Sequence, residues 1–318
     1  MTDKGGVKTA VDLAGLKLRT PMLVASGTFG WGTEFEEIEG FSGEAFGAIV
    51  LKGTTLEPRE GNRTPRIVET AGGAGILNAI GLQNPGVEYV LENYLPKLKD
   101  VKAKVVANVA GADVGEYAEV TARLGSHERI DAVEVNVSCP NVKKGGMHFG
   151  ADSGVCAEVV AACRKATTKP LIVKLSPNVT DICAIARAAV GAGADVLTVA
   201  NTVLGTAIDI HTRRPILGNV SGGLSGPAIK PIALQKVLEV ARLVEREKLG
   251  TPIIASGGIM TGEDALEFMI AGARAFAVGT ALLADFRAPE RIMSRIEELL
   301  VELNVKDVGD IVGTLDLS

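Results

Sequence analysis

One cysteine stands where a chemically active thiol is expected. Cys139 follows an apolar run, within AVEVNVSCPNVKKGG at residues 132–146, and a proline comes directly after it. Thiols that act as bases or nucleophiles occupy partly exposed positions, whereas structural thiols are buried inside an element. Cys156, Cys163 and Cys183 fall in helical patterns beside alanine and valine, so we expect them to be small buried hydrophobes. Cys139 is therefore the candidate catalytic residue.

Five further polar side chains interrupt short apolar runs that are typical of buried strands. They are Lys52, Lys174, Asn108, Asn136 and Asn201. Burying such groups is costly unless each finds a partner. The lysines suit either the Schiff base of an aldolase or a fixed cation beside a ring that gathers negative charge, as a reduced flavin does. The asparagines, joined by Asn78 in ILNAIGLQN, offer donor and acceptor together and favour a flat, amide-rich heterocycle.

Glycines follow the last two apolar runs. Gly257 and Gly258 lie in ASGGI, and Gly279 lies in VGTAL just before Thr280. Backbone N–H groups left bare by glycine bind anions, and (β/α)8 barrels often hold a phosphate after their seventh and eighth strands. Gly226, in GGLSG before the next helical pattern, adds another amide. Together these glycines predict a phosphate-bearing ligand.

Eight short β-branched runs must position these residues. They span 21–27, 47–55, 104–111, 132–140, 170–177, 196–202, 251–259 and 275–283. Nearly continuous apolarity is typical of parallel strands buried on both faces. Helical patterns lie between most of the runs, at 114–126, 153–167, 181–194 and 261–273, several of them behind a helix-start signal. The series predicts an α/β fold, a (β/α)8 TIM barrel, with its chemistry at the carboxyl ends of the strands.

Three segments stand apart from the repeating pattern. Residues 9–20, TAVDLAGLKLRT, alternate like a small N-terminal hairpin, which we expect at the barrel floor. Residues 55–86 and 203–226 are too long for simple turns, so we expect long loop insertions after strands two and six, standing over the catalytic end. The whole chain, 1–318, is interpreted as one domain, because such barrels commonly exceed about 200 residues.

Composition and charge argue against several function classes. With 33 basic and 38 acidic side chains the net charge is −5, which gives no electrostatic footprint for nucleic acid. No apolar run approaches the roughly 18 residues of a membrane span, and the N-terminus has no apolar signal core, so a cytoplasmic location is expected. The scattered His127, His148 and His211 have no metal-ligand spacing. Neither a dinucleotide fingerprint nor iron–sulfur cysteine spacing is present in the sequence.

Five motifs resemble those of the dihydroorotate dehydrogenases. They are ASGTFG (25–30), NAIGLQNPG (78–86), NVSCPNVKKGG (136–146), ASGGI (255–259) and VGTAL (278–282). The two asparagine-rich elements are the specific ones. The resemblance implies an FMN enzyme of pyrimidine biosynthesis that oxidises dihydroorotate to orotate. Cys139 would remove the C5 proton, from a loop able to close over the substrate, while hydride leaves C6 for FMN.

The resemblance also implies a role for each matching position. The cofactor-binding residues would be Ser26, Lys52, Asn108, Asn136, Lys174, Ala200, Gly226, Gly257, Gly258, Gly279 and Thr280. Lys174 would lie near the flavin ring and the glycines at the phosphate. The substrate-binding residues would be Lys52, Asn78, Ala79, Ile80, Gly81, Leu82, Asn136, Asn201 and Thr202.

Within the family, a cysteine base resembles the cytosolic classes, and the NVKKGGMHFG continuation resembles class IB. Class IB implies a partner subunit that carries FAD and a [2Fe-2S] cluster and passes electrons to NAD, with a homodimer inside a heterotetramer. A fumarate-linked class IA enzyme and a dihydropyrimidine dehydrogenase subunit stay open among the flavin barrels. A Schiff-base barrel aldolase and a non-catalytic binding barrel stay open from other classes.

Overall fold

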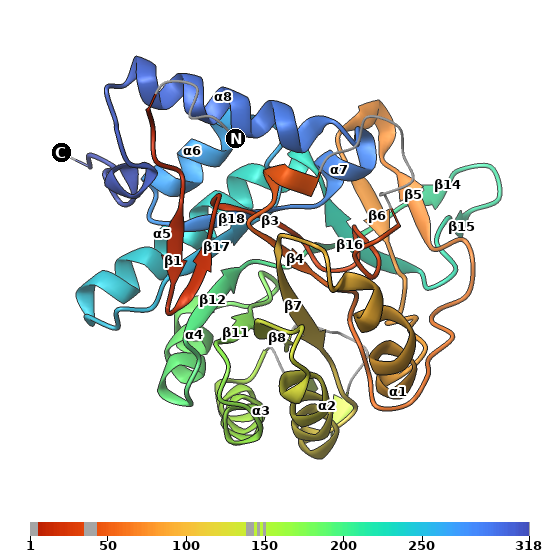
Figure 1. Ribbon diagram of the computed structural model, residues 1–318. Coiled ribbons are helices and arrows are strands. Elements are labelled where there is room, and N and C mark those ends of the chain that lie inside the picture. Colours follow the sequence, from red (N-terminus) through yellow and green to blue (C-terminus); the bar gives the residue numbers. More distant parts are fainter. Residues whose placement is uncertain (1–5, 35–42, 138–142, 145–146, 149–150, 318) are drawn as a thin grey trace.

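Eight parallel strands close into a barrel at the centre of the computed structural model (Figure 1). The structure describes residues 6–34, 43–137, 143–144, 147–148 and 151–317. Around the barrel the order is β3, β4, β7, β8, β11, β12, β17 and β18, which is also their order along the chain. The predicted (β/α)8 barrel is confirmed. That residues 1–318 form one domain stays a prediction.

The barrel strands are short and almost entirely buried. Their bounds are β3 Met22–Val24, β4 Ala48–Val50, β7 Lys104–Val109, β8 Ala132–Asn136, β11 Leu171–Lys174, β12 Val196–Val199, β17 Ile253–Ser256 and β18 Ala275–Val278. One face of each strand fills the barrel and the other lies under a helix, which explains the continuous apolarity. The strands end earlier than the apolar runs predict, because the residues that follow turn out of the ladder into the loops of the barrel mouth.

Helices cover the outside of the barrel (Figure 1). They are α1 Val87–Tyr89, α2 Val114–Ser126, α3 Ser153–Ala166, α4 Ile182–Gly191, α5 Lys230–Arg246, α6 Gly262–Ile270, α7 Thr280–Ala284 and α8 Ala288–Glu302. The π-helix η3 Val90–Tyr94 continues α1, and short 3₁₀ helices are η1 Gly43–Ala45, η2 Ala71–Gly73, η4 Leu95–Leu98, η5 Pro227–Ile229 and η6 Val308–Ile311. Among the described residues, no helix has both the length and the apolarity needed to cross a membrane.

Side chains at the predicted start signals cap two of these helices. Asp181 accepts a hydrogen bond from the Ala184 N–H at the start of α4. Thr261 and Asp264 form a reciprocal capping box at α6, as their spacing predicts. Each cap satisfies backbone donors that the first helical turn leaves unpaired.

The N-terminal hairpin lies at the floor of the barrel, as predicted. Strands β1 Val11–Leu13 and β2 Leu16–Leu18 pair antiparallel and bury their leucines. Arg19 then donates hydrogen bonds to the carbonyls of Phe46 and Gly43, close to the amino end of β4. The hairpin therefore covers the apolar interior where the strands begin.

The two long insertions fold together instead of forming separate loops. Strands β5 Ile67–Glu69 and β6 Ile76–Asn78 come from the first insertion, and β13 Val203–Thr206 and β16 Ser221–Ser225 come from the second. They form one antiparallel sheet in the order β13-β16-β6-β5, beside the small ribbon of β14 Ile208–Asp209 and β15 Arg214–Pro215 (Figure 1). A further ribbon pairs β9 Lys143–Lys144 with β10 Met147–His148. The sequence analysis predicts none of these strands.

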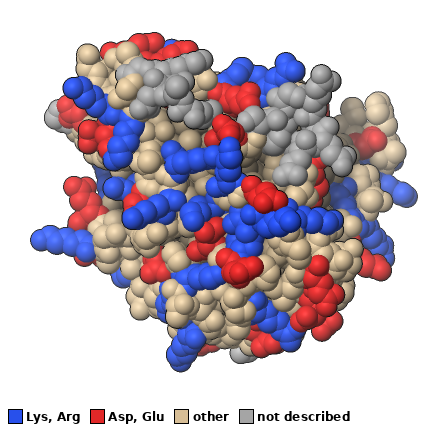
Figure 2. All heavy atoms as spheres, in the orientation of Figure 1, with Lys and Arg blue, Asp and Glu red and all other residues tan. Residues whose placement is uncertain are grey.

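Charged side chains of both signs are interspersed on the face of the molecule drawn in Figure 2. The small negative net charge is thus spread over the visible surface and not gathered into one field there.

Candidate active site

Amides and an ammonium group from adjacent strands meet at the carboxyl end of the barrel. Asn136 ends β8 and Lys174 ends β11, and the two residues are in register with each other. Asn201 follows β12, and its Nδ2 lies 3.5 Å from the Oδ1 of Asn136. The structure therefore brings together three of the polar residues that the sequence singled out.

Beneath this group a buried carboxylate joins three strands across the inside of the barrel. The Asn108 Nδ2 donates to Glu134 Oε1 at 2.7 Å, and the Thr198 hydroxyl donates to Glu134 Oε2 at 2.8 Å. All three side chains are almost fully buried. Glu134 and Thr198 are not among the predicted site residues, because they lie inside strands and not at the strand ends. The signal was present, since Ala132, Glu134 and Asn136 alternate on one face of β8.

Two polar groups at the mouth are buried and short of partners. Asn108 Oδ1 has no hydrogen-bond partner, although it is enclosed. The Lys174 side chain is also buried, and within the described part of the chain its ammonium group has no hydrogen bond or ion pair. Unpartnered buried polar groups are costly, so their presence indicates a ligand that supplies the missing contacts.

Lys52 lies at the edge of the same region. It lines a cavity of about 310 Å³ together with Trp31, Arg59, Gln83, Asn84, Pro85 and Tyr94. Burial lowers the pKa of the Lys52 ammonium, the charge of Glu34 opposes that shift, and Arg66 adds to it. The Trp31 and Tyr94 rings are stacked with their centroids 4.7 Å apart. Of these lining residues, the sequence analysis predicted only Lys52 as a site residue.

Glycines form a second part of the site, after β16, β17 and β18. Gly226, Gly257 and Gly258 all have positive φ, at 96°, 130° and 79°. A Cβ at Gly257 would lie 2.8 Å from the Cβ of Ala233, and one at Gly258 would lie 2.6 Å from the Cβ of Lys230. Both conformation and space therefore require glycine at this turn.

Thr280 lies beside Gly226 on the facing segment. A Cβ added at Gly226 would be 3.3 Å from the Thr280 Cγ2, and the Thr280 hydroxyl donates to Ser225 Oγ at 2.9 Å. Gly279 has ordinary room for a side chain, with its nearest neighbours at 3.4 Å or more. These glycines and Thr280 follow β16, β17 and β18, and backbone N–H groups at such turns suit a phosphate.

Two further predicted residues connect neighbouring strand ends. The Ser26 hydroxyl donates to the Leu51 carbonyl at 2.8 Å and connects the segment after β3 with the end of β4. The Ala200 N–H donates to the Ser256 carbonyl at 3.1 Å and connects β12 with β17. Both residues lie at the rim where the mouth loops begin.

The first insertion carries residues 78–82 to the mouth. Asn78 ends β6, and its Nδ2 donates to the Gly223 carbonyl at 3.2 Å. Asn62 holds the next two residues, donating from its backbone N to Ile80 O at 3.0 Å and from Nδ2 to Ala79 O at 3.1 Å.

The chain then turns at Gly81 and Leu82, which have positive φ of 76° and 58°. A Cβ added at Gly53 would lie 3.0 Å from Asn108 Oδ1 and 3.4 Å from the Leu82 side chain. The Leu82 side chain and the unpartnered Asn108 oxygen thus both lie close to Gly53.

Thr202 brings the second insertion to the same place. Its backbone N–H donates to Asn201 Oδ1 at 2.8 Å, and its carbonyl accepts from Asn178 Nδ2 at 2.9 Å. A Cβ at Gly223 would overlap the Thr202 hydroxyl, so glycine is required where β16 passes. Asn201 and Thr202 are therefore fixed against both the barrel and the insertion sheet.

The candidate catalytic residue, Cys139, lies outside the described residues, as do Pro140, Gly145 and Gly146 of its predicted loop. Asn136, three positions earlier, is held by its carbonyl, which accepts from the Tyr117 hydroxyl at 2.8 Å. The structure thus places the strand from which the Cys139 segment departs, and the role of Cys139 stays a prediction.

The other cysteines are structural. Cys156 and Cys163 are fully buried, and burial raises their pKa to about 12 and about 11. Cys183, on α4, is only partly buried, and its Sγ lies 3.5 Å from the Glu239 carbonyl oxygen on α5. Burial again raises the pKa of its thiol. The expectation of burial is right for Cys156 and Cys163 and holds only in part for Cys183.

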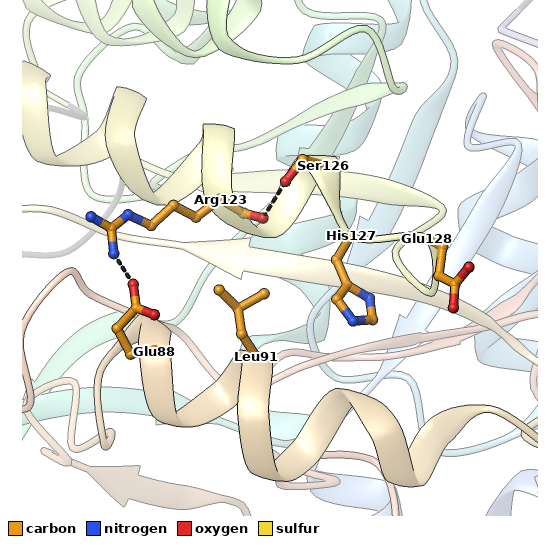
Figure 3. A pocket seen from close by; sticks show the side chains of 6 residues that line it. All are labelled: Glu88, Leu91, Arg123, Ser126, His127 and Glu128. Atoms are coloured by element: carbon orange, nitrogen blue, oxygen red, sulfur yellow. Dashed lines mark hydrogen bonds and ion pairs between the residues drawn. The ribbon is translucent and has the colours of Figure 1, made fainter.

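A larger hollow of about 580 Å³ lies on the outer helical surface, between the α1–η3 segment and α2 (Figure 3). It is lined by Glu88, Leu91, Arg123, Ser126, His127 and Glu128. Arg123 pairs with Glu88 across it, and the Ser126 hydroxyl donates to the Arg123 carbonyl at 2.9 Å. None of these residues belongs to the set at the strand ends. Within the described ranges, no group of three or more His, Cys, Asp or Glu side chains is placed to hold a metal ion.

Comparison with known proteins decides the family. A model described as dihydroorotate dehydrogenase matches residues 8–300, which is most of the chain. The chain belongs to the dihydroorotate dehydrogenase family. The resemblance carried by the five motifs is thereby confirmed, and so is the prediction of an oxidoreductase of this flavin-dependent family.

Curated relatives match this chain over nearly the whole length of both proteins. A protein of Citrifermentans bemidjiense named dihydroorotate dehydrogenase B (NAD(+)), catalytic subunit, is 51% identical over 308 residues, covering 97% of this chain and 98% of that protein. A protein of Trichlorobacter lovleyi with the same name is 52% identical over 307 residues, covering 96% of this chain and 98% of that protein. Among solved structures, the family enzyme of Eimeria tenella in complex with ferulenol has a TM-score of 0.80 at 24% identity, covering 98% of this chain and 89% of that one. That likeness supports the fold alone.

Proposed function

We propose that this protein oxidises dihydroorotate to orotate in pyrimidine biosynthesis, as the NAD-linked catalytic subunit of its family, in the cytoplasm. The observation that carries the proposal is its identity of about half, over nearly the full length of both chains, to relatives named dihydroorotate dehydrogenase B (NAD(+)), catalytic subunit. The convergence of amides, buried lysine and glycine backbone at one barrel mouth supports it independently.

The residues at the mouth fit FMN as the cofactor. Gly226, Gly257 and Gly258, all with positive φ, would offer backbone N–H groups to the phosphate. The buried Lys174 ammonium and the unpartnered Asn108 oxygen would both gain partners from a polar ring. The remaining proposed cofactor contacts are Ser26, Lys52, Asn136, Ala200, Gly279 and Thr280. FMN, when bound, supplies the acceptor for the hydride that leaves C6 of the substrate.

Dihydroorotate would lie between the barrel and the two insertions. Its amide edges match the donors and acceptors of Asn78, Asn136 and Asn201, with Ala79, Ile80, Gly81, Leu82 and Thr202 completing the contacts. Lys52 has a pKa lowered by burial, so a substrate carboxylate beside it would favour its charged form. Binding and protonation of Lys52 would therefore support each other.

Cys139 would remove the C5 proton. A free thiol with a pKa of about 8.5 is only a few per cent thiolate at neutral pH, yet it serves as a base when it is positioned over the C–H bond. Asn136, at the end of β8, fixes the start of the segment that carries Cys139. A closing loop around the thiol would exclude water during proton transfer.

Electrons would leave through a partner subunit that carries FAD and a [2Fe-2S] cluster and reduces NAD. The names of the relatives, with their words catalytic subunit and NAD(+), support this assignment. We further propose a homodimer of this chain inside a heterotetramer with the partner.

A visible spectrum of the purified protein, taken anaerobically before and after dihydroorotate, tests the proposal. We expect a yellow protein whose flavin absorbance is bleached by dihydroorotate and much less by dihydrouracil, which lacks the carboxylate. A colourless protein that does not take up FMN would overturn the proposal. Borohydride trapping of a carbonyl substrate on a lysine would then indicate an aldolase. The rate of electron transfer to fumarate should be compared with the rate to NAD in the presence of the partner subunit, because a fumarate-linked enzyme is the alternative within the family.

A further inference from the structure

The buried carboxylate of Glu134 has no role in the site proposed so far. It is 2% exposed, on β8, one alternation below Asn136. Both of its oxygens are used, Oε1 by Asn108 Nδ2 at 2.7 Å and Oε2 by the Thr198 hydroxyl at 2.8 Å. In the described part of the chain it forms no ion pair. An acidic side chain in this position needs a reason beyond packing, because an apolar residue would cost less to bury.

The geometry of the bond to Asn108 gives that reason. Both Glu134 oxygens act as acceptors, so Oε1 faces the NH₂ of the Asn108 amide and not its oxygen. The amide is planar, and fixing its nitrogen toward Glu134 points Oδ1 in the opposite direction. That oxygen is enclosed and has no hydrogen-bond partner.

The surroundings of this oxygen identify what it faces. It lies 3.0 Å from the position of a Cβ added at Gly53, next to Lys52, and the Leu82 side chain lies over the same glycine. Lys52 and Leu82 belong to the proposed ligand contacts, so Asn108 Oδ1 lies among residues of the proposed ligand site. A buried acceptor of this kind selects an N–H donor.

We infer that Glu134 is a positioning residue: it holds the Asn108 amide with its carbonyl oxygen toward the ligand, where that oxygen accepts an N–H of the bound ring. This inference rests on the proposed function, and the N–H donor belongs either to FMN or to the dihydroorotate ring. Glu134 itself contacts neither. Thr198 donates to the other carboxylate oxygen of Glu134.

The test uses binding to the full chain and not turnover. The FMN dissociation constant of the apoprotein is measured by flavin fluorescence, and that of orotate by titration of the FMN-loaded protein. The variants are Glu134→Leu, Asn108→Leu and the double variant. Glu134→Gln can still accept from Asn108 while donating to Thr198, so it is the conservative variant. Thr198→Val is the matched control, since it removes one hydrogen bond to the same carboxylate without touching Asn108.

We expect Glu134→Leu and Asn108→Leu each to weaken binding of one ligand about tenfold or more, and the double variant to bind no more weakly than Asn108→Leu. Glu134→Gln should stay within a few-fold of the parent and Thr198→Val within about twofold. A coupled loss of FMN affinity assigns the donor to the cofactor, and a coupled loss of orotate affinity alone assigns it to the substrate.

Two results would overturn the inference. One is a Glu134→Leu protein that binds both ligands as the parent does. The other is losses that multiply in the double variant, which would indicate independent structural effects. Thermal unfolding of each apoprotein shows whether it is folded. Glu134→Met, which has a similar length and cannot accept from Asn108 as a carboxylate does, replaces Glu134→Leu if that variant is not folded. A failure of the proposed function is distinct, because the parent protein itself would then bind no FMN.

Discussion

Polar side chains at the two ends of the barrel differ in whether other protein groups are their partners. At the floor, where the strands begin, charged side chains are satisfied by the protein itself. Arg129 donates to the carbonyls of Leu98, Val101 and Ala103 at 2.6 to 2.9 Å and pairs with Asp131 at 3.1 Å. At the mouth, the Lys174 ammonium and Asn108 Oδ1 have no such partners among the described residues.

The floor pattern repeats around the barrel. Lys169 donates to the carbonyls of His127 and Ile130, and Arg164 pairs with Asp195 at 2.7 Å. These contacts connect the loops that precede β8, β11 and β12 with one another and with the ends of α2 and α3. We conclude that the contacts at the floor stabilise the fold. The mouth keeps polar groups available for a ligand, which lowers stability.

The largest expected effect comes from the base at the mouth. Cys139→Ala should lower the rate of dihydroorotate oxidation by about 10²- to 10⁴-fold, since the C5 proton loses its acceptor. FMN binding and unfolding free energy should not change. Cys183→Ala, at a partly buried thiol on α4, is the matched control and should keep the parent rate. Turnover near the parent rate in Cys139→Ala would require another base.

A substitution at the floor of the barrel should lower the free energy of unfolding and leave FMN binding unchanged. Arg129→Leu leaves three carbonyls without their donor and removes one of the two ion-pair partners of Asp131, which keeps Lys104. The free energy of unfolding, measured in urea, should fall by about 2–4 kcal/mol. The FMN dissociation constant should stay at the parent value. The control is Arg246→Leu, which removes an exposed ion pair in which Arg246 lies 3.4 Å from Glu247. It should change the free energy of unfolding by less than about 0.5 kcal/mol. Equal losses for both variants would contradict the comparison.

Lys174→Met, at the mouth of the barrel, should weaken FMN binding without lowering the free energy of unfolding. FMN affinity should fall about tenfold or more, because the ring loses a fixed cation. The apoprotein should be as stable as the parent or up to about 1 kcal/mol more stable, because a buried ammonium without a partner is removed. Flavin fluorescence and urea unfolding measure the two quantities. A loss of stability as large as that of Arg129→Leu would show that Lys174 belongs to the scaffold.

The smallest effect concerns a satisfied pair near the mouth, Lys230 and Asp264, 2.5 Å apart. Burial raises the pKa of the Asp264 carboxyl, but hydrogen bonds from Lys230 and from the Met260 N–H outweigh it and hold the pKa below its usual value of 3.8. The unfolded state therefore binds the proton more readily. The stabilisation is complete above that value and is lost as the pH falls through the lower, folded-state pKa.

Asp264→Asn keeps an acceptor for the Met260 and Thr261 N–H groups but loses the ion pair with Lys230, so it should cost about 1 kcal/mol at pH 7. The difference between parent and variant should narrow below pH 3.8. Urea unfolding at several pH values measures it. A difference that is constant down to pH 2 would assign the effect to packing.

The sequence predicts the barrel well because its strands are buried on both faces. A run such as PLIVKLSP leaves no alternative to a parallel strand once helical patterns flank it. The polar residues at the strand ends follow from the same reasoning, since their depth is fixed by the strands that carry them. Asn136, Lys174 and Asn201 therefore lie together as expected.

The pairing of the insertions could not be predicted in the same way, and the alternation of Glu134 with Asn136 on β8 does not by itself reveal the contacts of that carboxylate. Strand β16 reads Ser-Gly-Gly-Leu-Ser, which has no apolar alternation, and it pairs with β6, which lies far away in the sequence. Such pairing depends on loop closure across the mouth, which no local pattern encodes. Glu134 lies inside a strand, and only its contacts with Asn108 and Thr198 on other strands reveal its use.

The shared sheet of the two insertions has a consequence for protein engineering. Because β6 and β16 are adjacent strands, residues 78–82 and residues 201–202 are anchored to one common support. A graft that replaces one insertion with that of a distant homologue would leave the other without its pairing edge. Chimeras designed to accept a new substrate should therefore transplant both insertions as one cassette.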